Sequence, residues 1–125
     1  MKSWSKFWKS SKKPGKQRKY RHNAPLHIRR KLVSSHLSKE LMKKHGKRSI
    51  AVVTGDKVKV ARGQFRGHTG KIEKVDVNHC KVFVTGIEIT KKDGNKTTYP
   101  IDPSNVIITE LKLDDKKRSQ ILGRK

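Results

Sequence analysis

The residues best suited to chemistry lie in one short loop between two apolar stretches. Its notable residues are cations and glycines: Arg62, Gly63, Arg66, Gly67, His68, Gly70 and Lys71. Glycine adopts positive φ and lets another chain approach closely at no steric cost. Phe65 is the only large apolar residue of the loop. A loop this rich in cations and accessible backbone N–H groups is suited to contact with a phosphate backbone.

The glycine pattern does not match the nucleotide-binding loops of enzymes. Gly70-Lys71 is followed by Ile72, where a P-loop needs Ser or Thr for magnesium, and Phe65 occupies the position of the first glycine. The loop also leads into a predicted strand, whereas a Rossmann loop opens a helix. Paired carboxylates are absent from this cationic region. We therefore expect a binding protein and not an enzyme.

Metal and redox chemistry are also disfavoured. The six histidines show no zinc-ligand spacing, and they are His22, His27, His36, His45, His68 and His79. Cys80 is the only cysteine, which excludes an internal disulfide and a cysteine metal cluster. We expect Cys80 to be a small buried strand residue, and we expect no metal and no cofactor.

Strand patterns position the loop. Val58 and Val60 alternate with lysines, which is typical of a half-buried strand. Strands are predicted at Ser49–Val53, Asp56–Ala61, Lys71–Val77, Lys81–Thr85, Glu88–Lys91, Thr97–Ile101 and Val106–Glu110. The alternation breaks between Ile72 and Val75, which indicates a bulge or bend. Asp93-Gly94-Asn95 predicts a tight turn, and residues 102–105 predict a turn or a single 3₁₀ turn. Many short strands this close together predict a mainly β fold, a small β-barrel.

Helical signals occur on both sides of the barrel. Asn23 as N-cap and Pro25 in the first turn predict a helix at Pro25–Ser34, and Gly46 ends a second at Leu37–His45. On the first helix Leu26, Ile28, Leu32 and Val33 are expected to face partly inward, and the apolar residues of the second are Leu37, Leu41 and Met42. The two helices contain one acid, Glu40, so RNA contact by Arg29, Arg30 and Lys31 is favoured over a merely solvated face. Asp114-Asp115 opens a last helix that runs to about Leu122.

Charge divides the chain into a hub and extensions. The net charge is +23, which calls for a polyanionic partner. Residues 1–50 hold 17 basic residues and one acidic residue, whereas residues 51–110 hold 10 and 7. We expect a disordered or RNA-bound tail at 1–21, which contains a Pro14-Gly15 breaker, and a helical basic extension at 22–48. The barrel is expected at 49–110, followed by a C-terminal helix and tail at 111–125.

The aromatic residues near the N-terminus leave three interpretations open. Trp4, Phe7 and Trp8 lie at helical spacing among lysines. They could stack on bases, pack as a short amphipathic helix on a neighbouring protein, or belong to a variable tail. No apolar stretch reaches transmembrane length and no signal-peptide hydrophobic region occurs, so we expect an intracellular, soluble protein without membrane contact.

The glycine loop and its flanks also carry a family resemblance. Gly55-Asp56-x-Val58-x-Val60, followed by Arg62-Gly63, Phe65-x-Gly67 and Gly70-Lys71-Ile72, resembles the KOW motif of ribosomal proteins and transcription elongation factors. The flanks RKYRHNAPLHIRRKLVSSHLSKEL and YPIDPSNVIITELKLDDKKR resemble the archaeal and eukaryotic form of large-subunit ribosomal protein twenty-four, called twenty-six in eukaryotes. The resemblance spans roughly Arg18 to Arg118 and implies an SH3-like barrel.

The resemblance implies a structural constituent of the large ribosomal subunit, located in the cytoplasm. Such proteins bind the 5′ region of large-subunit rRNA, act early in assembly and lie near the nascent-chain exit. The expected partners are this rRNA and neighbouring ribosomal proteins, with no small-molecule substrate and no homo-oligomer. The expected RNA-binding residues are Arg18, Lys19, Arg21, His22, Asn23, Arg29, Arg30, Lys31, Arg62, Gly63, Arg66, Gly67, His68 and Lys71.

Two other functions fit parts of the sequence. A KOW-type elongation module would bind RNA polymerase, but that class pairs its KOW domain with another folded domain. The N-terminal half of this chain lacks an apolar core for one. A DNA-compacting basic protein would have the same composition, because both polyanions attract the same charges. The flanking sequence and the predicted barrel favour rRNA.

Overall fold

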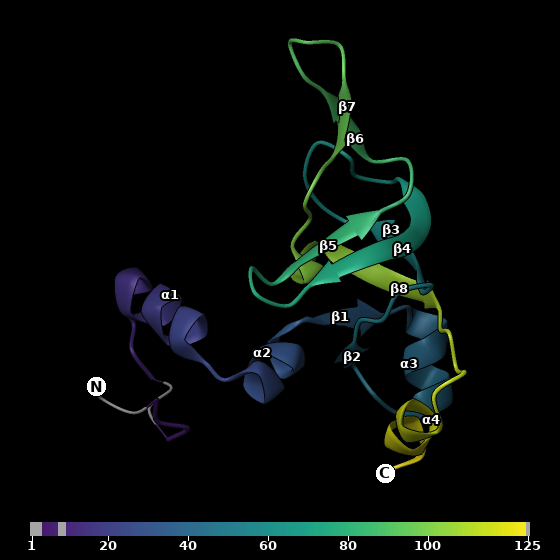
Figure 1. Cartoon of the computed structure of the whole chain (residues 1–125). Coiled ribbons are helices and arrows are strands. Elements are labelled where there is room, and N and C mark those ends of the chain that lie inside the picture. Colours follow the sequence, from purple (N-terminus) through teal and green to yellow (C-terminus); the bar gives the residue numbers. More distant parts are fainter. Residues whose placement is uncertain (1–3, 8–9, 125) are drawn as a thin grey trace.

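A computed structural model describes residues 4–7 and 10–124 of the chain (Figure 1). The helices are α1 (Pro14–Asn23), α2 (Leu26–Leu32), α3 (Lys39–His45), the 3₁₀ turn η1 (Pro103–Asn105) and α4 (Lys116–Gly123). The strands are β1 (Ser34–Leu37), β2 (Ser49–Ala51), β3 (Lys57–Val60), β4 (Thr69–Asp76), β5 (Lys81–Val84), β6 (Glu88–Thr90), β7 (Lys96–Thr98) and β8 (Val106–Glu110). The fold is mainly β with helical extensions, as the sequence predicts.

Six strands form one curved sheet in the order β2-β1-β8-β3-β4-β5. Neighbours are antiparallel except β1 and β8, which are parallel. The first half of β4 pairs with β3 and the second half with β5, and the register shifts between Ile72 and Lys74. This irregularity lies where the broken alternation predicts a bulge, and it bends the sheet toward closure (Figure 1).

The barrel interior is filled by aliphatic side chains. Val58, Ile72, Val82, Val84 and Ile108 are each no more than 2% exposed. Burial of each such side chain contributes about 1.5–3 kcal/mol before the entropic cost of ordering. β-Branched residues suit this interior, because they pack well on a pleated surface.

Strand β1 is the largest departure from the sequence-based expectation. The sequence predicts that residues 34–37 end one helix and begin another, but they form a strand between β2 and β8. Leu37 is fully buried and Val33 just before β1 is 2% exposed, so both belong to the core. A four-residue strand carries too little periodicity to identify, and its partner β8 lies about 70 residues later.

The N-terminal helices also differ from expectation in their bounds and caps. Pro14-Gly15 is not a breaker, because Pro14 opens α1, where its missing N–H costs nothing. Asn23 ends α1 and does not cap α2, whose N-cap is Pro25 without a side-chain cap bond. Leu26 is 61% exposed, so its predicted inward orientation is wrong. Leu32 is 39% exposed and also lies outside the core.

Several local predictions are confirmed. Gly46 ends α3 with φ of 63°. The β6–β7 turn contains Gly94 at φ 80°. Asp115 caps α4 through the Lys117 N–H.

Cys80 is not the buried strand residue that its apolar character predicts. It lies in the turn between β4 and β5, half-buried, with φ of 53°. Its Sγ contacts the Val77 carbonyl oxygen at 3.8 Å.

The helices are short and polar. Within residues 4–7 and 10–124, none of them has the length and apolar character needed to cross a membrane.

Candidate nucleic-acid interface

The glycine loop between β3 and β4 is a folded turn held by its own backbone. The Gly67 N–H donates to the Val60 carbonyl at 2.8 Å, and the Arg66 N–H donates to the Gly63 carbonyl at 3.1 Å. Gly63 and Gly67 have φ of 92° and 90°, a region that L side chains avoid. A Cβ at either position would meet no atom within 4 Å. These two glycines are therefore required for backbone conformation and not for close packing.

Gly70 serves a different purpose from its neighbours in the loop. A Cβ there would lie 2.7 Å from the Thr85 carbonyl oxygen and 2.8 Å from Val84 Cγ1. β4 approaches the end of β5 this closely because the Lys71 N–H donates to Thr85 Oγ1 at 3.0 Å. Gly70 thus lets β4 lie close to the end of β5 at the base of the loop.

The loop cations divide into free and committed side chains. Arg62, Arg66 and Lys71 are exposed and form no ion pair within the described part of the chain. His68 is half-buried, and its Nε2 lies 3.0 Å from the Thr85 carbonyl oxygen. The His68 ring also lies against Gly86. His68 therefore braces the loop, and the three other cations are available to a ligand.

Lys59 is absent from the predicted site residues, and the structure adds it to the cationic surface. Lys59 is exposed on β3, opposite Thr69 of β4. Its neighbour Lys57 is neutralised, because Lys57 Nζ lies 2.7 Å from Glu110 Oε1. The outward position of Lys59 could have been read from its alternation with buried Val58 and Val60. Only the sheet register shows that, among the described residues, Lys57 has an acidic partner and Lys59 has none.

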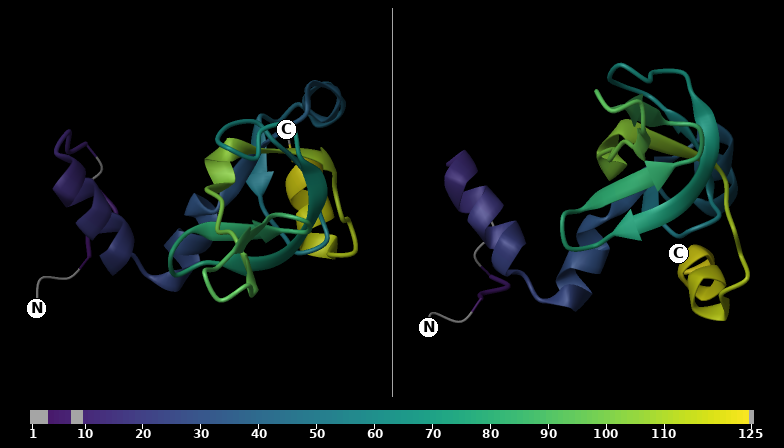
Figure 2. Two further views of the ribbon diagram at one scale, coloured as in Figure 1. Left: turned by 90° about the horizontal axis from the view of Figure 1, so that it is seen from above. Right: turned by 45° about the horizontal axis from the view of Figure 1, so that its top comes forward.

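The basic arm, which comprises the tail and helices α1 and α2 before β1, projects away from the barrel. Helix α1 stands apart from the sheet in each view (Figures 1 and 2) and contains no buried residue. The predicted contacts on α1 are all exposed, and they are Arg18, Lys19, Arg21, His22 and Asn23. Among the described residues, every ion pair involves cations from residue 57 onward. The positive charge of the arm is thus not neutralised by any ion pair within its described residues.

Arg29 differs from the other predicted arm contacts. Its Nε donates to the Ala24 carbonyl at 2.7 Å, and its Nη1 donates to Asn78 Oδ1 at 3.0 Å. A further bond joins Nη2 to the His22 carbonyl oxygen. The guanidinium therefore links the α1–α2 elbow to the β4–β5 turn. Arg30 and Lys31 remain exposed on α2, as expected.

The first aromatic residue packs back onto the arm. Trp4 Nε1 donates to the Tyr20 carbonyl at 3.1 Å, and the two ring centroids lie 4.9 Å apart. Phe7 is 82% exposed, and residues 4–7 do not form a helix. Trp8 lies outside the described residues. Trp4 thus packs within the arm itself. This contact decides none of the three interpretations for Phe7 and Trp8.

Potential metal ligands do not gather in the described part of the chain. Within residues 4–7 and 10–124, no group of three or more His, Cys, Asp or Glu side chains could hold a metal ion. One titratable pair does occur in the β4–β5 turn, where His79 Nδ1 lies 2.6 Å from Asp76 Oδ2. This hydrogen bond and those from the His79 and Asn78 N–H groups hold the pKa of Asp76 below its ordinary value.

Comparison with known proteins identifies the family. Residues 11–125 match the model of the family that comprises ribosomal proteins L26 of eukaryotes and their archaeal form, ribosomal protein twenty-four. The chain belongs to this ribosomal protein family. It is 48% identical over 115 residues to the large ribosomal subunit protein uL24 of Methanosphaera stadtmanae, covering 92% of this chain and 98% of that protein. It is 50% identical over 113 residues to uL24 of Methanoculleus marisnigri, covering 90% and 93%.

Membership of the uL24 family gives the coarse function. The chain is a structural protein of the large ribosomal subunit, located in the ribosome in the cytoplasm, and it is not an enzyme. The match includes most of the basic arm as well as the barrel. This coverage favours the ribosomal assignment over an elongation module or a DNA-compacting protein.

Proposed function

We propose that this uL24 family protein binds large-subunit rRNA through phosphate and shape contacts. The observation that carries the proposal is the set of exposed cations without acidic partners on the described part of the arm and the glycine loop. Unpaired cations on this scale repel one another, and a phosphate backbone relieves that repulsion while its condensed counterions are released. Phosphate contacts position a protein without reading sequence, which suits a structural role.

The two halves of the chain would bind in different ways. The barrel has a packed core and docks as a rigid body, presenting Arg62, Arg66 and Lys71 from the glycine loop. The arm, including Arg18, Lys19, Arg21, His22, Asn23, Arg30 and Lys31, follows the RNA as an elongated cationic element. In this scheme Gly63 and Gly67 shape the loop, while His68 braces the loop and Arg29 holds the arm.

The resemblance supports a more specific proposal for location and timing. The protein would bind the 5′ region of the rRNA, near the nascent-chain exit, beside other large-subunit proteins and as a single copy. An arm with few buried residues gains little from folding alone, so it orders most easily along RNA that is still open. This favours entry early in subunit assembly.

Sedimentation tests the binding proposal directly. The full chain, expressed with a tag, should sediment with the large subunit and remain there after a wash in moderate salt. A matched variant with Arg18, Lys19 and Arg21 changed to Gln keeps α1 intact but removes three charges, and it should wash off at lower salt. Recovery of the wild-type chain only in the soluble fraction would overturn the proposal.

The assembly role requires a truncation that spares the core. Removal of residues 1–48 would delete β1 and therefore damage the sheet itself. Removal of residues 1–21 leaves β1 and its partners intact. Cells that carry only this shorter form should accumulate immature large subunits, because the barrel still docks but the arm contacts are missing. Mature subunits formed at the normal rate would contradict an assembly role for the arm.

A further inference from the structure

We infer that a pocket beside the glycine loop receives one unstacked base of the rRNA. This inference rests on the proposed rRNA-binding function and adds to it a contact of a different kind from phosphate binding. The pocket has a volume of about 180 Å³. The glycine loop and the segment from Tyr99 to η1 supply most of its lining, including Arg62, Gln64, Phe65, Tyr99, Ile101 and Asn105.

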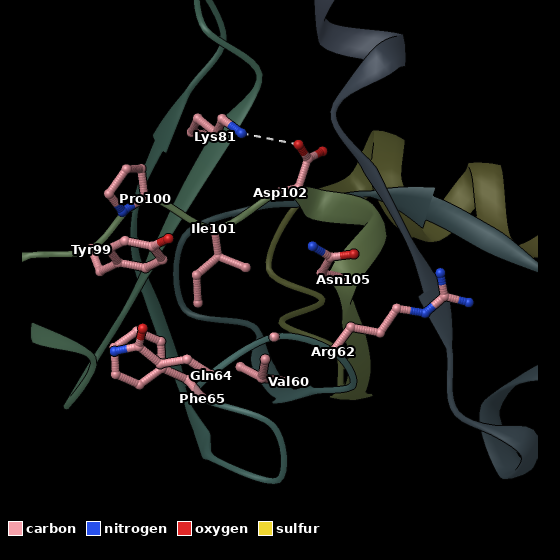
Figure 3. A pocket seen from close by; sticks show the side chains of 11 residues that line it. Val60, Arg62, Gln64, Phe65, Lys81, Tyr99, Pro100, Ile101, Asp102 and Asn105 are labelled. Atoms are coloured by element: carbon pink, nitrogen blue, oxygen red, sulfur yellow. Dashed lines mark hydrogen bonds and ion pairs between the residues drawn. The ribbon is translucent and has the colours of Figure 1, made fainter.

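Two aromatic rings form one wall of the pocket. The Phe65 and Tyr99 ring centroids lie 5.3 Å apart, and the rings are inclined at 53° (Figure 3). Phe65 is half-buried and Tyr99 is 38% exposed, so the wall is ordered by packing yet open to a ligand. Proteins that hold single-stranded nucleic acid stack bases on aromatic rings of this kind. Val60 and Ile101, both buried, add an apolar floor.

The opposite side of the pocket is polar. Asn105 and Asp102 lie on the far side of Ile101 from the aromatic pair, and the Asp102 carboxylate points toward Lys81 (Figure 3). Asp102 Oδ2 accepts from Lys81 Nζ at 3.0 Å, which offsets a carboxylate that would otherwise repel RNA. The side-chain amide of Asn105 makes no hydrogen bond to the residues that the structure describes, and neither does that of Gln64, which Figure 3 draws beside Phe65. An amide supplies both a donor and an acceptor, which is what the edge of a base requires.

Cations without acidic partners among the described residues lie on the loop beside the pocket. The Arg62 side chain extends away from the aromatic pair (Figure 3), which leaves its guanidinium free to contact a phosphate of the bound strand. Arg66 belongs to the same exposed turn. An apolar side chain from a neighbouring protein could use the aromatic wall, but it would gain nothing from these cations or from the two amides. The combined chemistry therefore favours a nucleotide.

The size of the pocket selects a single ring system. Sites for drug-sized ligands and cofactors enclose about 300–1,000 Å³, which is larger than this pocket. The fold also holds the pocket in shape before any ligand arrives. The Ala61 N–H donates to the Asn105 carbonyl at 2.8 Å, and Val82 and Ile101 exchange two backbone bonds at 2.9 Å each. Only one base needs to leave its stack to fill it.

The test compares the affinity of full-length variants for protein-free large-subunit rRNA over a series of salt concentrations. Tyr99→Ala should weaken binding about 5- to 150-fold at every salt concentration, because a stacked base is lost. The slope of log affinity against log salt should not change, since no phosphate contact is lost. Tyr99→Phe is the matched control and should bind like wild type. Arg66→Ala should instead lower the slope by about one.

The outcomes separate this site from the proposed function. Wild-type binding that Tyr99→Ala leaves unchanged would overturn the base-binding role of the pocket alone and leave the proposed rRNA binding intact. Loss of affinity through a lower slope would show a phosphate contact and also overturn the proposal. If the wild-type chain fails to bind rRNA, both proposals fail. Ultraviolet crosslinking within assembled subunits should attach a nucleotide to Phe65 or Tyr99, and adducts confined to other residues would contradict a base in the pocket.

Discussion

Arg118 and Asp56, 62 residues apart in the chain, form a two-pronged ion pair in the interior. Arg118 Nη1 and Nη2 lie 2.7 and 2.6 Å from the two carboxylate oxygens of Asp56. Arg118 is 4% exposed and Asp56 is fully buried. Asp56 also accepts from the Val53 and Lys112 N–H groups, and Arg118 donates to the Lys112 carbonyl. The pair thereby attaches α4 to the turn before β3.

Replacing Arg118 should strongly destabilise the protein. Arg118→Met leaves the Asp56 carboxylate buried without its counter-charge, so the free energy of unfolding should fall by about 3–5 kcal/mol. The measurement is urea denaturation of wild type and variant. Lys117→Met is the matched control, because Lys117 is exposed on the same helix. Equal unfolding midpoints for both variants would show that α4 is not held through this pair.

Gly70→Ala should destabilise the barrel. The added methyl would lie 2.7 Å from a backbone oxygen of Thr85, which cannot move without disturbing the β4–β5 pairing. Overpacking of this kind costs about 1–3 kcal/mol. Gly15→Ala tests the same substitution in open space within α1, where alanine favours the helix and stability should be unchanged or slightly higher. Thermal unfolding of both variants is the measurement. If Gly70→Ala unfolds at the wild-type temperature, the strands can move apart to admit the methyl group without cost.

Arg29→Gln should loosen the arm without unfolding the barrel. It removes the bonds to Ala24 and Asn78, so amide hydrogen exchange should accelerate in α1 and α2 while the sheet remains protected. Arg30→Gln removes the same charge from an exposed position and should leave exchange unchanged. If the two variants exchange alike, the Arg29 contacts do not hold the arm.

The arm should dominate the salt dependence of rRNA binding. Residues 1–21 carry nine lysines and arginines, and each phosphate neutralised adds close to one unit to the slope of log affinity against log salt. Removal of these residues should therefore lower the slope by several units, whereas Lys71→Ala should lower it by about one. Filter binding from low to moderate salt measures both slopes. A truncated chain with the wild-type slope would show that residues 1–21 make no phosphate contacts.

The Asp76–His79 pair should give a contribution to stability that disappears in acid. Its hydrogen bonds hold the folded pKa of Asp76 below the ordinary value of 3.8. A depressed folded pKa stabilises the protein above the unfolded pKa, and the gain is lost as pH falls through the folded pKa. Wild type should therefore be more stable than His79→Ala at about pH 5 and equal to it well below pH 3.8. A stability difference that is constant over this range would contradict the linkage, and an NMR titration of Asp76 provides the direct check.

The local patterns of the sequence determined much of the molecule. Alternation of Val58 and Val60 with lysines identifies β3, because a strand's two faces differ at every second residue. Gly46 and Asp115 predict helix ends, since capping depends on residues within one turn. The partition of charge between arm and barrel is likewise a property of the chain alone. These signals are short-range, so they survive without knowledge of the partners.

Tertiary structure decided the features that depend on distant partners. β1 is a strand because β8 pairs with it in parallel. The four residues of β1 carry no strand pattern of their own, and the sequence places them at the ends of two predicted helices. Arg118 is one more C-terminal cation in the linear sequence, yet Asp56 draws it into the interior. Phe65 and Tyr99 meet only when the sheet closes, so the pocket has no counterpart in the linear pattern. These arrangements depend on contacts between segments about 30 to 70 residues apart, and local residue types do not encode such contacts.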